Sequence, residues 1–318
     1  MIRIAILDDY ANRALESADW SSLEETKIQV FTHHLGHNVD VVADALNAFD
    51  VIVAMRERTP FPAALIEKLP NLRLLVTTGM RNLSFDLEVG RRYGVDICGT
   101  ESLAYPAFEH TWALILALTK QIPFEDRTMK SGGWQQGTGI GLNGKVLGIL
   151  GLGNLGSKVA RVGNAFEMEV IAWSENLNQD RCDQVGRVKY VDKNELFERA
   201  DIISIHLILS ERTRNLIGAA ELALMKTCAY LINTSRGPII DENALLDCLQ
   251  MQRIAGAAID VFDVEPLPVE HPYRGLTNMV LTGHTGYVVE ELYTYSYNQV
   301  IENIRAWMLD KPIRLLNA

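Results

Sequence analysis

The stretch Lys145–Gly156, which reads KVLGILGLGNLG, decides the fold of the domain that contains it. Its first six residues form a mostly apolar run that predicts a short, buried β-strand, and the residues from Asn154 to Phe166 predict an amphipathic helix. A G-x-G-x-x-G pattern between a strand and a helix is typical of a dinucleotide-binding turn, whereas the same glycines without that context would be weak support.

Each residue of this turn has a distinct predicted role. Gly151 permits the tight turn, Gly153 lets the backbone approach a pyrophosphate, and Gly156 allows close packing of the helix on the strand. The N–H groups of Asn154 and Leu155 are predicted to face the anion at the positive end of the helix.

Composition limits the remaining choices. A chain of 318 residues, 48% of them hydrophobic, is long enough for two globular domains. The net charge of −10 argues against a nucleic-acid partner or an anionic membrane surface. The four scattered cysteines are typical of reduced thiols, and the chain shows neither a signal-peptide pattern nor an apolar run long enough to span a membrane. We therefore expect a cytoplasmic protein without a membrane partner, and no metal site.

Strand and helix patterns alternate through both halves of the chain, which predicts parallel sheets with right-handed crossovers. The predicted fold is α/β, with two doubly wound parallel-sheet domains: a Rossmann cofactor domain inserted into a flavodoxin-like substrate domain. The cofactor domain is expected over residues 104–288 and the substrate domain over residues 1–103 and 289–318. The tail from Lys311 to Ala318 is expected to pack back on the N-terminal domain, and Trp134 is expected to pack between the domains.

Polar residues follow three predicted strands of the cofactor domain. Arg236 follows the strand Tyr230–Asn233, Glu265 lies in the loop after Asp260, and His284 follows the last strand. Ligands bind outside the carboxyl ends of parallel strands, so these side chains are expected near the cofactor. The set indicates hydride transfer at a carbon bearing oxygen. His284 would give or take the proton, Glu265 would hold its imidazole, and Arg236 would polarise the carbonyl and clamp a carboxylate.

Each of these residues also has a structural interpretation. Arg236 could be a solvated residue in a strand-ending turn, Glu265 only a loop acid, and His284 a satisfied structural histidine. The catalytic interpretation is favoured because all three follow strands beside the nucleotide motif.

The chain resembles the D-isomer-specific 2-hydroxyacid dehydrogenase family along nearly its whole length. The matching segments are LNGKVLGILGLGNLGSKVA, SIHLILSERTRNLIG, LINTSRGPIIDENALLDCL, AGAAIDVFDVEPLP and VLTGHTGY. The resemblance implies an NAD(P)-dependent oxidoreductase that interconverts a small D-2-hydroxy acid and a 2-oxo acid. It places the catalytic residues of the family on Arg236, Glu265 and His284.

The resemblance also implies the binding residues. Nicotinamide-side contacts fall on Thr234, Arg236 and Asp260, and the substrate carboxylate is bound by the Thr78–Gly79–Met80 turn assisted by Arg236. Arg56 is expected to form another wall of the substrate pocket. Members of the family are usually homodimers joined through the cofactor domain.

Three positions depart from the usual pattern of the family. Gly283 stands where Pro often precedes the catalytic histidine. The Gly79–Asn82 turn lacks the Val-Asp-Asn sequence that is frequent in the family, so the identity of the acid substrate is left open. The family motif places an acid at the end of the strand that faces the ribose. In this chain Ser174 occupies that position, directly after Trp173, and Glu175 comes one residue later. Ser174 would not repel a 2′-phosphate but Glu175 would, which favours NAD over NADP. His206 is expected to line the adenine side.

Two other functions remain open. A dedicated phosphoglycerate or formate dehydrogenase would use the same fold, but no residue pattern indicates a phosphate-specific pocket. The alternative of a different class is an NAD(H)-sensing interaction protein without significant turnover. The intact set of Arg236, Glu265 and His284 favours the enzyme over the sensor.

Overall fold

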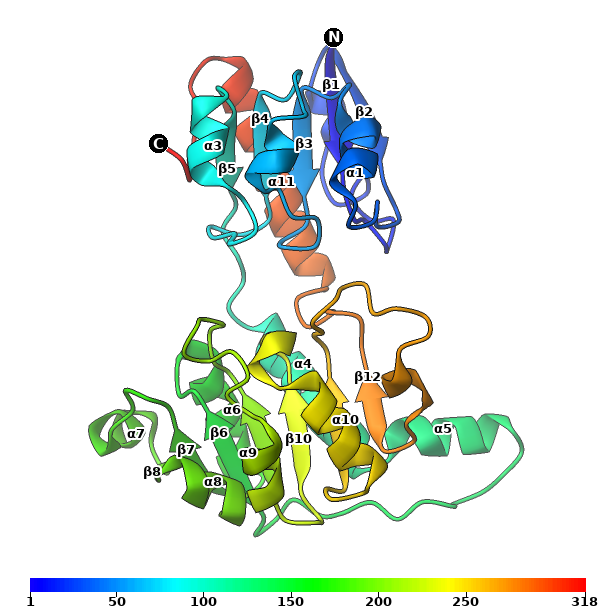
Figure 1. Ribbon diagram of the computed structural model, residues 1–318, viewed down its shortest axis with the longest axis vertical. Coiled ribbons are helices and arrows are strands. Elements are labelled where there is room, and N and C mark those ends of the chain that lie inside the picture. The colour runs from blue at the N-terminus through cyan, green and yellow to red at the C-terminus, as the bar shows by residue number, and fades with distance from the viewer. The chain divides into compact units, whose positions relative to one another are not determined.

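The structure, a computed structural model, describes residues 1–318 and divides into two compact units (Figure 1). One unit comprises Met1–Leu103 together with Val288–Ala318, and the other comprises Ala104–Tyr287. Each unit is built on its own parallel sheet with helices, so the α/β prediction of two doubly wound domains is confirmed.

The first unit has a five-stranded sheet in the order β2-β1-β3-β4-β5, the order of flavodoxin-like folds. Its strands are β1 (Ile2–Ile6), β2 (Thr26–Val30), β3 (Val51–Ala54), β4 (Leu74–Thr77) and β5 (Asp96–Gly99). Its helices are α1 (Val39–Leu46), α2 (Ala63–Ile66), α3 (Leu87–Arg92) and α11 (Glu290–Met308). Strands β3 and β4 are buried along their whole length, because helices cover the parallel sheet.

Strand β2 is absent from the sequence prediction. It lies at the edge of the sheet, pairs only with β1, and leaves Lys27 and Gln29 exposed. A half-covered edge strand alternates apolar and polar residues, so the sequence TKIQV contains no continuous apolar run that would indicate a buried strand.

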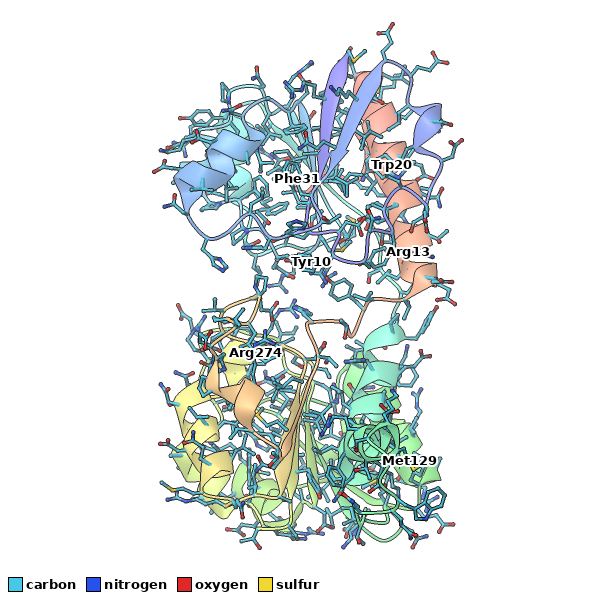
Figure 2. The ribbon with its side chains drawn as sticks, turned by 90° about the vertical axis from the view of Figure 1, so that its right-hand side faces the viewer. Tyr10, Arg13, Trp20, Phe31, Met129 and Arg274 are labelled. Carbon is cyan, nitrogen blue, oxygen red and sulfur yellow. The ribbon has the colours of Figure 1, made fainter.

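The C-terminal segment completes this unit. Helix α11 brings Tyr297 into an edge-on ring contact with Trp20, with centroids 5.8 Å apart. Figure 2 labels Trp20 beside this helix. After α11 the chain returns to β5, where Leu316 N–H donates to Ile97 O and Gly99 N–H donates to Arg314 O. The prediction that the tail packs on the N-terminal domain is therefore confirmed.

The second unit has a seven-stranded sheet in the order β12-β11-β10-β9-β6-β7-β8, with the strand of the Gly-rich motif near its centre. Its strands are β6 (Val146–Leu150), β7 (Glu169–Trp173), β8 (Lys189–Tyr190), β9 (Ile202–Ile205), β10 (Tyr230–Asn233), β11 (Gly256–Ile259) and β12 (Met279–Leu281). Its helices are α4 (Pro106–Thr119), α5 (Ile122–Lys130), α6 (Asn154–Ala165), α7 (Gln179–Val185), α8 (Lys193–Arg199), α9 (Ala219–Leu224) and α10 (Glu242–Gln250).

Two helices, α4 and α5, follow one another directly at the start of this unit. Helix α4 ends at Thr119, Gln121 takes a left-handed φ of 56°, and Pro123 lies in the first turn of α5. Figure 1 shows α5 extending away from the strands of the sheet. Trp134, for which packing between the domains is expected from the sequence, has a relative exposure of 75%.

None of the helices is long and apolar enough to cross a membrane.

Candidate active site

The Gly-rich turn connects β6 to α6 as the sequence predicts. Gly151 has a φ of 97°, and a Cβ built on Gly156 would lie 2.0 Å from the Gly151 carbonyl oxygen. Neither position can therefore hold a side chain without moving the backbone. A Cβ on Gly153 would meet no atom within 4 Å, so the outer side of the turn is open. The turn fits a pyrophosphate: it is tight on the protein side and open on the other.

The start of α6 also fits an anion. Gly153 is its N-cap, and no side chain caps the helix. The first N–H groups of a helix have no intrahelical partner, and those of Asn154 and Leu155 begin this one. Beside them, Arg181 of α7 donates to Leu152 O at 3.4 Å and to Ser157 Oγ at 3.1 Å.

The residues predicted to contact the ribose and the adenine lie at the ends of β7 and β9, the two strands that flank β6. Ser174 follows β7 and is half-buried, and Glu175 is exposed. His206 follows β9, and its Nε2 atom lies 2.8 Å from Ser204 Oγ. Burial lowers the pKa of His206 to about 4, so its imidazole is neutral at ordinary pH.

Arg236 lies just beyond β10, where the backbone turns sharply. Asn233 Nδ2 donates to Arg236 O at 2.9 Å, and the Arg236 guanidinium donates to Ser235 O at 2.7 Å. Gly237 packs so tightly on the backbone of Phe262 that a Cβ would lie 2.2 Å from its carbonyl carbon. The Thr234 hydroxyl lies 2.8 Å from that of Thr111 on α4. The loop is thus held on both sides of Arg236.

Asp260, directly after β11, anchors the loop that carries His284. Its carboxylate is 1% exposed and accepts hydrogen bonds from Thr282 Oγ1 at 2.6 Å, Thr285 N at 2.8 Å and Gly286 N at 2.9 Å. Burial acts to raise the pKa of Asp260, but the hydrogen bonds from His110 and Thr282, together with the charge of His110, lower it below its usual value. The carboxylate is therefore the stable form.

His284 and Glu265 form the pair predicted from the sequence. His284 Nδ1 lies 2.6 Å from Glu265 Oε2, and the other carboxylate oxygen accepts from Phe262 N at 2.9 Å. His284 has a left-handed φ of 54°, and its N–H donates to Asp260 O at 2.7 Å. The ring of Tyr287 packs edge-on against the imidazole. With Nδ1 bonded to the carboxylate, Nε2 is the atom left to exchange a proton with a ligand.

The first unit brings Arg56, Thr78 and Gly79 together at the carboxyl ends of β3 and β4. Arg56 has a φ of 54°, its N–H donates to Thr78 Oγ1 at 3.1 Å, and its guanidinium donates to Thr78 O at 3.4 Å. The Thr78 N–H donates a hydrogen bond to Ala54 O, and the Gly79 N–H donates one to Thr100 Oγ1. A carboxylate at this turn would therefore accept hydrogen bonds from the Met80 N–H and the Arg56 guanidinium. The Met80 residue is half-exposed.

The structure adds residues that the sequence analysis did not assign to the site. Arg181 touches the Gly-rich turn, Thr111 touches the loop of Arg236, and His110 touches Asp260. No motif marks them. His110 and Thr111 follow Glu109 on a mostly apolar helix, and this run of three polar residues is the only signal for them in the sequence.

This arrangement defines a class of protein: a two-unit α/β oxidoreductase whose dinucleotide-binding unit also carries a histidine–carboxylate pair. Comparison with known proteins identifies the family. The profile described as "D-isomer specific 2-hydroxyacid dehydrogenase, NAD binding domain" matches residues 112–286. The chain belongs to this family, which consists of NAD-dependent oxidoreductases acting on 2-hydroxy acids, and its cofactor is NAD or NADP.

Individual relatives support the assignment. The chain is 36% identical over 264 residues to a glyoxylate reductase from Aeropyrum pernix, covering 80% of this chain and 78% of that protein. It is 36% identical over 276 residues to a D-3-phosphoglycerate dehydrogenase from Synechocystis, covering 86% of this chain but only about half (49%) of that protein. A solved phosphoglycerate oxidoreductase from Vibrio cholerae superposes with a TM-score of 0.92 at 33% identity, covering 98% of this chain and 100% of that one.

Proposed function

We propose that the protein reduces a small 2-oxo acid to the D-2-hydroxy acid, and catalyses the reverse oxidation, with His284 as the general acid and base. The observation that carries the proposal is the 2.6 Å contact between His284 and Glu265, on a loop anchored by Asp260 in the unit that holds the Gly-rich turn. A histidine whose Nδ1 is held by a carboxylate presents Nε2 to a substrate oxygen.

Because the Gly-rich turn fits a pyrophosphate, we place the cofactor on this turn and on the strand ends around it. Asn154 and Leu155 would bind the pyrophosphate, Ser174 and Glu175 the ribose, and His206 the adenine side. Thr234 and Asp260 would lie on the nicotinamide side. When bound, the nicotinamide supplies or accepts the hydride at the substrate carbon.

The substrate would be held by cationic and backbone donors. Arg236 would bind the carboxylate and polarise the carbonyl, because its planar fork donates two parallel hydrogen bonds. Arg56, with the turn Thr78–Gly79–Met80, would contribute further carboxylate contacts, of which the guanidinium of Arg56 and the N–H of Met80 are the principal donors. Glu265 would keep the imidazole of His284 oriented and stabilise its protonated form during reduction.

The assembly would be a homodimer formed through the second unit. Helix α5 and the loop after it expose four large apolar side chains, at relative exposures of 40–75%: Ile122, Phe124, Met129 and Trp134. An exposed apolar patch of this kind is typical of a protein–protein interface.

A substrate screen tests the proposed activity. Glyoxylate, hydroxypyruvate, pyruvate, 3-phosphohydroxypyruvate, and branched and aromatic 2-oxo acids are assayed with NADH and with NADPH. We expect turnover of at least one acid, and His284→Ala is expected to lower kcat about 10²–10⁴-fold while leaving cofactor binding intact. Binding of reduced cofactor without turnover of any acid would instead favour the NAD(H)-sensing interaction protein.

A further inference from the structure

Two neighbouring residues of α4 contact the loops that carry Arg236 and His284. Thr111, which is fully buried, lies 2.8 Å from the hydroxyl of Thr234, two residues before Arg236. His110 Nε2 lies 3.3 Å from Asp260 Oδ1 and 3.0 Å from Thr282 Oγ1, two residues before His284. One turn of this helix therefore touches the ends of β10, β11 and β12.

The hydrogen bonds around Asp260 define which atom of His110 carries a proton. Thr282 donates its hydroxyl proton to Asp260, so its oxygen is left to accept a second hydrogen bond. Both atoms near His110 Nε2 are then acceptors, and Nε2 must be the donor to them. His110 thus donates to the carboxylate and to the threonine that the carboxylate holds.

His110 also packs against the far end of the same loop. A Cβ on Gly286 would lie 3.0 Å from Asp260 Oδ2 and 3.5 Å from His110 Cδ2. The loop from Thr282 to Gly286 is therefore enclosed between the carboxylate of Asp260 and the ring of His110. His284, in the middle of this loop, has a left-handed backbone that requires support from its surroundings.

We propose that His110 is a positioning residue for the reaction: by holding Asp260 and Thr282, it fixes the loop that presents His284. The proposal rests on the proposed function of His284. His110 acts through Asp260 and Thr282 and does not itself exchange a proton with the substrate. A displacement of the general acid of about 1 Å costs on the order of 100-fold in rate, which sets the size of the expected effect.

The test compares His110→Phe with His110→Gln. Phenylalanine keeps the ring packing against Gly286 but lacks the Nε2 donor, whereas glutamine retains an amide N–H at nearly the same position. We expect kcat of His110→Phe to fall about 10–100-fold, with a smaller change in KM for the 2-oxo acid, and His110→Gln to recover most of the loss.

His271→Phe is the matched control. His271 is buried to a similar degree, and its Nε2 lies 3.1 Å from Glu242 Oε1 in the same unit, but it does not contact the loop of His284. This variant is expected to keep the wild-type kcat. Wild-type kcat in His110→Phe, an equal loss in His271→Phe, or a failure of glutamine to rescue a folded protein would each overturn the proposal.

A second measurement does not depend on turnover. In protein labelled with ¹³C-histidine, the imidazole C–H resonance of His284 is assigned by its loss in His284→Gln. It should shift in His110→Phe, return in His110→Gln and stay unchanged in His271→Phe. If no 2-oxo acid is turned over, the proposed activity fails while this resonance still decides whether His110 positions His284; an unmoved resonance in His110→Phe overturns the inference.

Discussion

At the scale of single residues, the identity of Arg236 matters more than its charge. Its guanidinium already donates to Ser235 O, which orients the planar fork from the end of β10. We expect Arg236→Lys to lose nearly as much kcat/KM as Arg236→Ala, because an ammonium group cannot make two parallel bonds to a carboxylate.

Steady-state kinetics with a substrate accepted by the wild-type protein measures this loss, in both kcat and KM. Arg253→Lys, an exposed arginine after α10, is the control and should leave both unchanged. Normal kinetics in Arg236→Lys would show that Arg236 is only a solvated residue of the turn.

A second residue-scale prediction concerns stability and pH. His206 has a pKa of about 4 in the folded protein and about 6.5 when unfolded, so below pH 6.5 the unfolded chain binds the proton first. Its contribution to stability is therefore complete above pH 6.5 and is lost as the pH falls towards 4. Between pH 7.5 and pH 5 we expect this single group to remove on the order of 1–2 kcal/mol of unfolding free energy.

Urea denaturation of the protein without cofactor at the two pH values checks this expectation. His206→Gln keeps a polar partner for Ser204 but does not titrate, so its stability should fall less than that of the wild type on acidification. His37→Gln, at an exposed position, should follow the wild-type curve. Equal losses in the wild type and His206→Gln would contradict the assignment of His206 as a buried neutral histidine.

At the scale of elements, the end of β7 is expected to set the choice between NAD and NADP. Ser174 is half-buried directly after the strand and Glu175 is exposed beside it. Ser174→Asp should increase the preference for NAD, because a carboxylate there accepts the ribose hydroxyls and repels a 2′-phosphate. We expect the ratio of kcat/KM for NADH over NADPH to rise by about 5–100-fold.

Glu175→Gln provides the opposite change and should lower that ratio. Both variants are compared with the wild type using the same 2-oxo acid. If neither variant alters the ratio, the end of β7 does not face the ribose, and Arg181 beside the Gly-rich turn becomes the next position to test.

At the scale of the whole molecule, the exposed apolar side chains of residues 122–134 predict self-association. Trp134→Glu should convert a dimer, at twice the chain mass of 35.5 kDa, into a monomer, because it places a charge at the most exposed of these side chains. Light scattering coupled to size-exclusion chromatography measures the mass. Tyr93→Glu, at a tyrosine 52% exposed in the first unit, should remain dimeric. A monomeric wild type would refute the proposed interface.

The sequence determined the features that depend on short-range patterns. The Gly-rich motif between a strand and a helix identified the cofactor domain, because tight turns and close helix–strand packing require glycine at fixed spacing. The alternation of strand and helix patterns predicted both parallel sheets. The polar residues that follow the strands of the cofactor domain predicted that Glu265 and His284 lie close together. These features follow from the geometry of parallel sheets, in which the carboxyl ends of strands share one edge.

Only the tertiary structure decided the contacts that cross from one element to another. The edge strand β2 and the exposure of Trp134 depend on what packs against each segment. The contacts of His110 with Asp260 and Thr282 join residues separated by 150 or more positions in the chain. Local periodicity contains no information about such pairs, because burial and hydrogen-bond partners are set by long-range packing.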